Sequence, residues 1–221
     1  AVSVVAVSFN KNCLIGAYRN GDLSQVYPIA RGAAPVLVAL GAWLLAGESK
    51  SLLEIAGIAI VSLGILSLAW RPGPLRWPNL RDDEAILFAL ATGLCIAGYS
   101  VADGMGGRAS GAVFTYIAWL FATDAIAIVA FVFWRRRHNL WTAVRPQLLR
   151  GLAGGCVATL AYSIVIWAMS VAPMAQVVAL RETSVLIAAG IGALVLKEGF
   201  GTQRIAAAAV VVGGAALLHL A

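Results

Sequence analysis

Long apolar runs separated by short polar gaps follow one another along the whole chain. Each run is close to the roughly 20 residues that an α-helix needs to cross the hydrocarbon core of a bilayer. The runs show no alternation of apolar and polar positions, so the strands of a membrane β-barrel are not expected. We therefore predict eight transmembrane helices, at residues 1–18, 24–46, 52–70, 85–102, 111–134, 150–171, 174–196 and 203–221.

The composition leads to the same fold class. Hydrophobic residues make up 61% of the chain and charged residues 12%, against roughly a quarter charged in soluble domains. A chain of this length cannot hide so much apolar surface in one water-facing core, so we expect an all-α integral membrane protein. The net charge of +6 comes from Lys and Arg that crowd into the gaps between apolar runs. That distribution is typical of loops at a membrane face and does not indicate a nucleic-acid partner.

The chain also resembles itself after a shift of 150 residues. The shift aligns segment 24–46 with segment 174–196, which lies five segments later. An odd number of crossings turns the second copy upside down, so we expect the inverted repeat found in many secondary transporters. The second copy then holds five segments and the first three, which predicts that two helices are missing from the front. The matched positions include Arg31 and Arg181, Glu48 and Glu198, and Gly64 and Gly214.

Several junctions between the predicted helices resemble those of a known family. Residues 17–35 read AYRNGDLSQVYPIARGAAP, which is similar to the junction of the third and fourth helices in EamA-type transporters of the drug/metabolite transporter superfamily. The ending Gly47-Glu48 and the following 53–64 region are similar to the next junction, and residues 196–198 to the ninth-to-tenth junction. A complete member has ten helices in a 5+5 inverted repeat. The resemblance implies that this chain supplies helices three to ten and lacks the first two.

The resemblance and the repeat together predict the organisation and the function. Residues 1–70 would form an incomplete first repeat with helices three to five, 71–84 a loop between the repeats, and 85–221 a second repeat with helices six to ten. The implied function is that of a secondary transporter, an exporter or permease of small organic metabolites, amino-acid-like solutes included. It would work by alternating access about a midplane cavity in a bacterial cytoplasmic (inner) membrane. The alternative is a lipid-handling or structural membrane protein that moves no solute.

Enzymatic activity is not expected. The sequence contains no phosphate-binding glycine loop, no HExxH and no nucleophile elbow. The three cysteines lie singly in apolar runs without metal-ligand spacing, so neither a metal nor a cofactor is predicted. The expected partners are a small solute and the lipid bilayer. Coupling to protons stays open, and no oligomeric state is predicted.

Ionisable residues inside a membrane span are costly and are therefore candidates for function. Arg31 and Arg181 lie equally deep in the two inverted copies, so they would flank the midplane, where such transporters bind substrate. Snorkelling of both side chains to an interface is the alternative. Glu182 follows Arg181 directly, so the two side chains should diverge by about 100° and each should need a partner on another helix.

Asp124 lies close to the centre of its span, where a short side chain cannot reach water. It should therefore face the protein interior. Three states are open: a carboxylate paired with Lys11, Arg31 or Arg181, a proton-coupling group, or a protonated packing residue.

Asn10 and Lys11 lie at the depth of Arg31 on the neighbouring segment. Two cations this close would favour an anionic or carboxylate-bearing ligand, or they would be neutralised by Glu182 or Asp124. Further polar residues either line a cavity or tie helices together. These are Tyr27, Tyr99, Tyr162 and Gln176.

The ends of the spans carry residues with expected structural roles. Glu48 and Glu198 are predicted to stabilise the start of the next helix. The glycine-rich stretch 104–108 is predicted to be a loop. Most Lys and Arg residues of the loops fall on one side of the membrane. Short loops rich in Lys and Arg stay in the cytoplasm, so this side is predicted to be cytoplasmic. That count would place the C-terminus outside, whereas members of the resembled family usually keep both ends in the cytoplasm.

Overall fold

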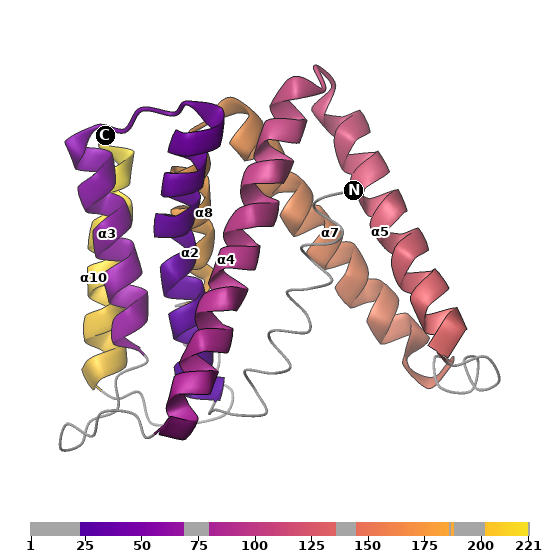
Figure 1. The fold of residues 1–221 in the computed structure, drawn as a ribbon, viewed down its shortest axis with the longest axis horizontal. Coiled ribbons are helices and arrows are strands. Elements are labelled where there is room, and N and C mark those ends of the chain that lie inside the picture. The colour runs from indigo at the N-terminus through magenta and orange to yellow at the C-terminus, as the bar shows by residue number, and fades with distance from the viewer. Residues whose placement is uncertain (1–22, 69–79, 136–144, 186, 188–201, 221) are drawn as a thin grey trace.

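The computed structural model describes residues 23–68, 80–135, 145–185, 187 and 202–220. Within these residues the regular secondary structure is helical (Figure 1). The elements are α2 (Leu23–Ala46), α3 (Leu52–Ser67), α4 (Leu80–Ala109), α5 (Val113–Arg135), the 3-10 turn η1 (Arg145–Gln147), α7 (Leu148–Val171), α8 (Met174–Glu182) and α10 (Thr202–His219).

The described helices confirm an all-α membrane architecture. Four of them are long and apolar enough to cross a bilayer, and two shorter ones are also apolar. The predicted total of eight spans stays a prediction, because segment 1–18 and residues 188–196 of segment 174–196 lie outside the described residues. The four spans are Tyr27–Ala46, Ile86–Ala109, Val113–Phe133 and Arg145–Val171, and the shorter helices are Leu52–Ser67 and Ile205–His219.

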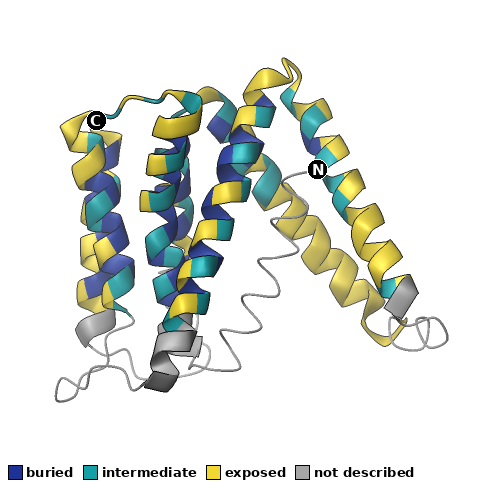
Figure 2. Ribbon diagram, viewed as in Figure 1, coloured by how far each residue is buried: buried dark blue, intermediate teal, exposed yellow. Residues whose placement is uncertain are grey.

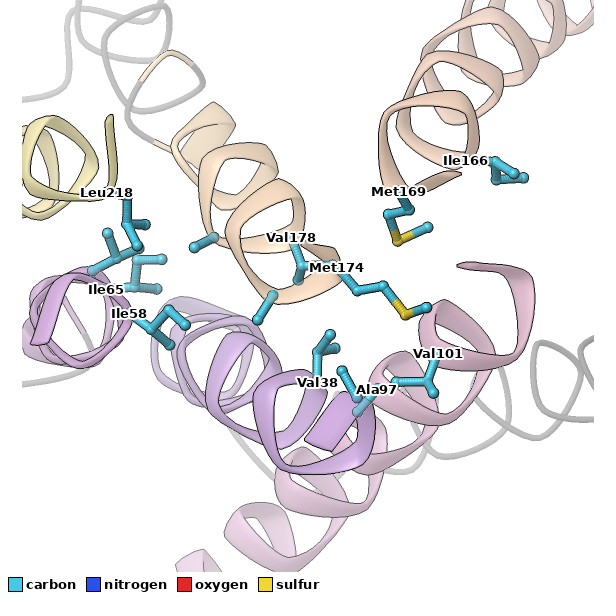
Figure 3. Close-up of a cluster of buried hydrophobic side chains, with 14 of the residues drawn as sticks. Val38, Ile58, Ile65, Ala97, Val101, Ile166, Met169, Met174, Val178 and Leu218 are labelled. Carbon is cyan, nitrogen blue, oxygen red and sulfur yellow. The ribbon is translucent and has the colours of Figure 1, made fainter. Parts of the chain in front are cut away.

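The helix α2 lies at the centre of the packed part of the molecule. It contacts α3, α4 and α8, and α10 packs on α3, behind it in Figure 1. Buried aliphatic and methionine side chains from these helices form one core, into which Val38, Met174 and Val178 project (Figure 3). By contrast, α5 and the first half of α7 expose most of their residues (Figure 2). An apolar helix surface of this kind suits contact with lipid rather than water.

The α3 and α10 helices approach each other closely through glycines, two of which are related by the repeat. A Cβ on Gly64 would lie 2.6 Å from Val211 Cγ2, and a Cβ on Gly214 would lie 2.9 Å from the Val61 nitrogen. Small residues at such crossings allow two backbones to come into contact within a membrane. The 150-residue shift turns Gly64 into Gly214 and Val61 into Val211. The two contacts are therefore counterparts of each other.

The α4 helix corrects one sequence prediction. The span was expected to end at residue 102 and the stretch 104–108 to be a loop, yet the helix continues to Ala109. The polar residues in this last part find protein partners instead of water. Asp103 is fully buried and accepts two tyrosine hydrogen bonds, and Arg108 donates to the carbonyl oxygen of Met169.

Candidate functional site

Two arginines and one glutamate meet between α2 and α8. Arg31 Nη1 donates to both carboxylate oxygens of Glu182, at 3.1 and 3.0 Å. Arg181 donates to Glu182 Oε1 from Nε at 3.2 Å and from Nη2 at 2.9 Å. The Glu182 side chain is fully buried, whereas Arg31 keeps 29% of its side chain exposed. We call these three residues the arginine–glutamate cluster.

The cluster arises from the antiparallel packing of α2 against α8. Arg31 lies eight residues after the first residue of α2 and meets Glu182, the last residue of α8. At the other end, Glu48, just beyond α2, accepts a hydrogen bond from the Met174 N–H at the start of α8. The sequence pointed to both arginines and to Glu182 because charges are rare within its apolar runs.

One expectation about this cluster is wrong. Arg181 and Glu182 were predicted to diverge and to need separate partners, but they form an ion pair at 2.9 Å. The 100° rule describes only the direction in which side chains leave the helix. An arginine side chain is long enough to bend back around the helix toward a buried carboxylate next to it. Glu182 also contacts Arg31 on another helix, as expected.

Aromatic residues surround the arginines. The Arg31 guanidinium lies 5.2 Å from the centroid of the Tyr27 ring, which is within cation–π range. The Arg181 guanidinium interacts with the Tyr99 hydroxyl. The Tyr99 ring in turn meets the Tyr162 ring edge to face, with the centroids 6.1 Å apart. Three of the predicted residues, Tyr27, Tyr99 and Tyr162, thus lie at or beside the cluster.

A second polar cluster, which sequence reasoning missed, surrounds Asp103 on α4. Tyr162 on α7 donates a hydrogen bond to Oδ2 at 2.8 Å, and Tyr116 on α5 donates to Oδ1 at 3.1 Å. Asp103 follows Tyr99 by one helical turn, so both residues lie on the same face of α4. The signal in the sequence was an acidic residue directly after the predicted end of a span, and the neighbouring glycines made it look like a loop.

A third set of charges, the Glu48 knot, closes the end of the molecule at which α2 and α4 end. Glu48 pairs with Lys50 and accepts a hydrogen bond from Arg108 at 2.7 Å. Arg108 also donates to the carbonyl oxygens of Met169 and Ala172 at the end of α7. Gly47 has a positive φ of 66°, a left-handed conformation that ends α2. The change of chain direction places Glu48 in this knot. The knot borders an open pocket of about 410 Å³.

Glu48 therefore acts on a different helix from the one expected. The start of the next helix, α3, is stabilised by a capping box in which Ser51 and Glu54 bond each other's backbone N–H. Glu48 instead contacts the first residue of α8, Met174. Gln176, another predicted site residue, donates to Glu54 Oε1 at 2.7 Å and so ties α8 to the start of α3.

Three predicted residues lie outside the described part of the chain: Asn10, Lys11 and Glu198. Their positions stay predictions. Within the described residues, no group of three or more His, Cys, Asp or Glu side chains is arranged to hold a metal ion.

Comparison with known sequences decides the family. The EamA-like transporter family matches residues 84–220, which is more than half of the chain. The chain belongs to the EamA-like transporter family. The resemblance noted in the sequence is thereby confirmed, and the protein is a multi-pass membrane protein of a transporter family rather than of an enzyme family. A transporter of this family handles small solutes in a lipid bilayer.

The fold of the chain is also found in a solved structure, although no curated sequence is similar to it. No curated protein matches the sequence significantly. Among solved structures, a crystal structure of a protein matches with a TM-score of 0.75 and 19% sequence identity, covering 99% of this chain and 76% of that chain. At this identity the likeness shows the fold alone.

In this EamA-like transporter, Asp124 does not join the arginine–glutamate cluster. Arg31 and Arg181, two of its three expected partners, bind Glu182 instead, and Lys11 lies outside the described residues. Asp124 is half-buried on α5, and its buried Oδ1 has no hydrogen-bond partner among the described residues. A buried oxygen without a partner destabilises the fold.

Asp124→Leu should therefore raise the stability of the transporter, by about 1–3 kcal/mol. The free energy of unfolding, measured by denaturant titration in detergent micelles, checks this. Asp103→Leu is the matched control and should have the opposite effect, because it removes the acceptor of two tyrosine hydroxyls. A loss of stability in Asp124→Leu would contradict the prediction.

The Glu48 carboxylate should make stability depend on acidity. Burial raises the pKa of Glu48, but hydrogen bonds from Lys50, the Met174 N–H and Arg108 outweigh this and leave the pKa below its ordinary value of 4.5. As the pH falls, the Glu48 carboxylate is therefore protonated in the unfolded chain at a higher pH than in the folded protein. The stability that Glu48 contributes is complete above the ordinary pKa of a glutamate. It is lost as the pH falls through the lowered pKa of Glu48 in the folded protein.

Thermal unfolding of the wild type and Glu48→Gln across a pH series tests this. We expect the variant to be less stable at neutral pH, by about 1–3 kcal/mol, and the difference to disappear in acid. A difference that does not change with pH would contradict the role assigned to this carboxylate.

Proposed function

We propose that this chain is a secondary transporter of small organic metabolites, amino-acid-like solutes included, and that the arginine–glutamate cluster is its solute-binding centre. The observation that carries the proposal is the meeting of three charged side chains between two helices of a transporter-family fold. Charged residues this deep in apolar helices are costly and mark substrate pathways. Their convergence on one place favours transport over a purely structural or lipid-handling role, in which they would be dispersed.

We further propose that the fold is a 5+5 inverted repeat of which this chain carries eight spans. The paired contacts Gly64–Val211 and Gly214–Val61 support this, because the 150-residue shift converts one into the other. So does the pairing of α2 with its counterpart α8 in antiparallel directions. In transporters of this plan the two repeats rock against each other around a fixed central site.

Alternating access also requires each end of the site to close in turn. The Glu48 knot joins the ends of α2, α4 and α7 to the start of α8 at one face. We propose that the knot holds this face closed and that its bonds break when the face opens. Asp124 is the candidate for coupling to protons, should transport depend on them.

Flux measurements test the proposed function. The chain is reconstituted in liposomes and offered a panel of labelled organic acids, amino acids, amines and neutral metabolites. We expect saturable uptake of some of these solutes, which Arg31→Gln lowers by at least about tenfold. The matched control, Arg150→Gln, removes the same charge from an exposed position at the start of α7 and should transport normally. Uptake that is equal with and without protein, or equal in Arg31→Gln and the wild type, would contradict the proposal.

A further inference from the structure

We infer that the arginine–glutamate cluster binds the carboxylate group of a singly charged organic acid, and that the Nε and Nη2 edge of Arg31 is the binding group. This inference rests on the proposed function, because it names the solute class that the centre takes. Three independent features of the cluster support it: its charge balance, its unused hydrogen-bond donors and its one accessible face.

The cluster carries one positive charge more than its own carboxylate neutralises. Arg31 and Arg181 both bind Glu182. The 150-residue repeat supplies the two arginines as counterparts, but the counterpart of Glu182 is Gly32. A side chain has no room there, because a Cβ on Gly32 would lie 2.7 Å from Leu66 Cγ. The packing of α2 on α3 therefore keeps a second glutamate out of the equivalent position.

The unused donors lie on Arg31. Its contact with Glu182 engages Nη1 alone, which bonds both carboxylate oxygens. Arg181, in contrast, uses Nε and Nη2 for the same carboxylate. In the described part of the chain no residue accepts a hydrogen bond from Nε or Nη2 of Arg31. These two nitrogens form the edge of a guanidinium that binds a carboxylate through two parallel hydrogen bonds.

The accessible face lies on the same residue. Arg31 keeps 29% of its side chain exposed, whereas Glu182 is fully buried and Arg181 keeps 15% exposed. The Tyr27 ring beneath the guanidinium restricts its orientation. A solute that reaches the cluster therefore meets an oriented arginine edge first. The helices that carry these groups, α2 and α8, are in contact, and Figure 1 shows α8 behind α2.

The charge and geometry together select the solute class. One carboxylate balances the excess charge of the cluster, whereas a doubly charged anion would leave an excess negative charge beside buried Glu182. An amide has the same shape, but it has no charge and cannot accept two parallel hydrogen bonds.

Because the bound carboxylate and Glu182 share Arg31, solute binding weakens the tie between α2 and α8. That weakening gives the solute a means to shift the two repeats relative to each other.

Binding measurements on the full chain in uncharged detergent micelles test the inference. The probes are acetate, butyrate and benzoate, each compared with its amide, together with succinate and inorganic phosphate. Affinity is measured by the rise in unfolding temperature and by calorimetry. We expect each acid to bind at least about tenfold more tightly than its amide, and more tightly than succinate or phosphate. Arg31→Gln should remove this preference, and Arg150→Gln should keep it.

Removal of the competing carboxylate gives the opposite change. Glu182→Gln frees Arg31 from its internal partner and should bind the acids about tenfold more tightly than the wild type. If this variant does not fold, the double variant Arg181→Gln, Glu182→Gln keeps the net charge of the cluster and should still bind them. A purely structural ion pair predicts no gain in affinity in Glu182→Gln and no binding of the acids in the double variant.

The outcomes separate this inference from the proposed function. Equal binding of acids and amides, stronger binding of phosphate, or an unchanged preference in Arg31→Gln overturns the inference, whatever the flux. Acids that bind at Arg31 but are never transported support the site and contradict the transport function. Flux of neutral solutes without acid binding leaves the transport function and overturns the carboxylate site.

Discussion

Replacing Glu182 with leucine should lower the free energy of unfolding by about 3–5 kcal/mol, the largest loss expected from a single side chain in this protein. The substitution leaves the guanidinium groups of Arg31 and Arg181 side by side, without the carboxylate that they share. Denaturant titration in detergent micelles measures the loss.

A triple variant is the control for this prediction. Arg31→Met, Arg181→Met and Glu182→Leu together replace the whole cluster with apolar side chains, which should restore most of the lost stability. The triple variant should nevertheless transport no solute if the cluster is the binding centre. A triple variant as unstable as Glu182→Leu alone would show that the loss comes from altered packing and not from unpaired charge.

Enlarging Gly214 should separate α10 from α3. Gly214→Ile places a branched side chain where even a Cβ would lie 2.9 Å from Ile60 Cγ2 and from Val61 N. Because one of these atoms belongs to the α3 backbone, it cannot rotate away. We expect a loss of about 3 kcal/mol, at the upper end of the range for overpacking.

The adjacent glycine gives a matched control. A Cβ on Gly213 would have no atom within 4 Å, and the residue is exposed. Gly213→Ala should therefore be neutral or stabilise the helix by about 0.5–1 kcal/mol. Unfolding measurements on both variants check the contrast. Equal losses at the two positions would show that the contact with α3 does not decide the effect.

The sequence predicts the membrane class and the main charged residues because both follow from short-range patterns. Apolar runs of sufficient length identify spans, and Arg31, Arg181 and Glu182 are conspicuous within them. The internal repeat aligns the two arginines through the order of residues alone. These inferences need no knowledge of which helices touch.

The pairing of these residues is harder to predict, because it depends on how the helices pack and how far each side chain reaches. The sequence left Glu182 as one of two acidic residues that could neutralise Arg31. Its contact with Arg181 was not expected, because side chains of successive helical residues point in different directions. Asp103 was missed because it follows the predicted end of a span, where a charge usually meets water. Its partners, Tyr116 and Tyr162, lie on two other helices.

Glu48 illustrates the same limit at a helix end. A glutamate that follows the glycine at the end of one helix is expected to stabilise the start of the next helix. In this chain Glu54, three residues after the N-cap Ser51, stabilises that start instead. Ser51 and Glu54 cap α3, which leaves Glu48 available for α8. The residues that it joins are 126 positions apart in the chain, so no local pattern indicates the contact.

The separation of Arg31 from Glu182 has a consequence for how the protein is made. The two residues are 151 positions apart, so at ordinary rates of synthesis Arg31 emerges from the ribosome roughly eight to thirty seconds before its partner. An arginine at the centre of a helix opposes insertion by the translocon by about 2.5–3.5 kcal/mol. During this interval α2 carries its charge without Glu182, so its place in the bilayer is less favourable than in the finished protein. The ion pair forms only once α8 has been made.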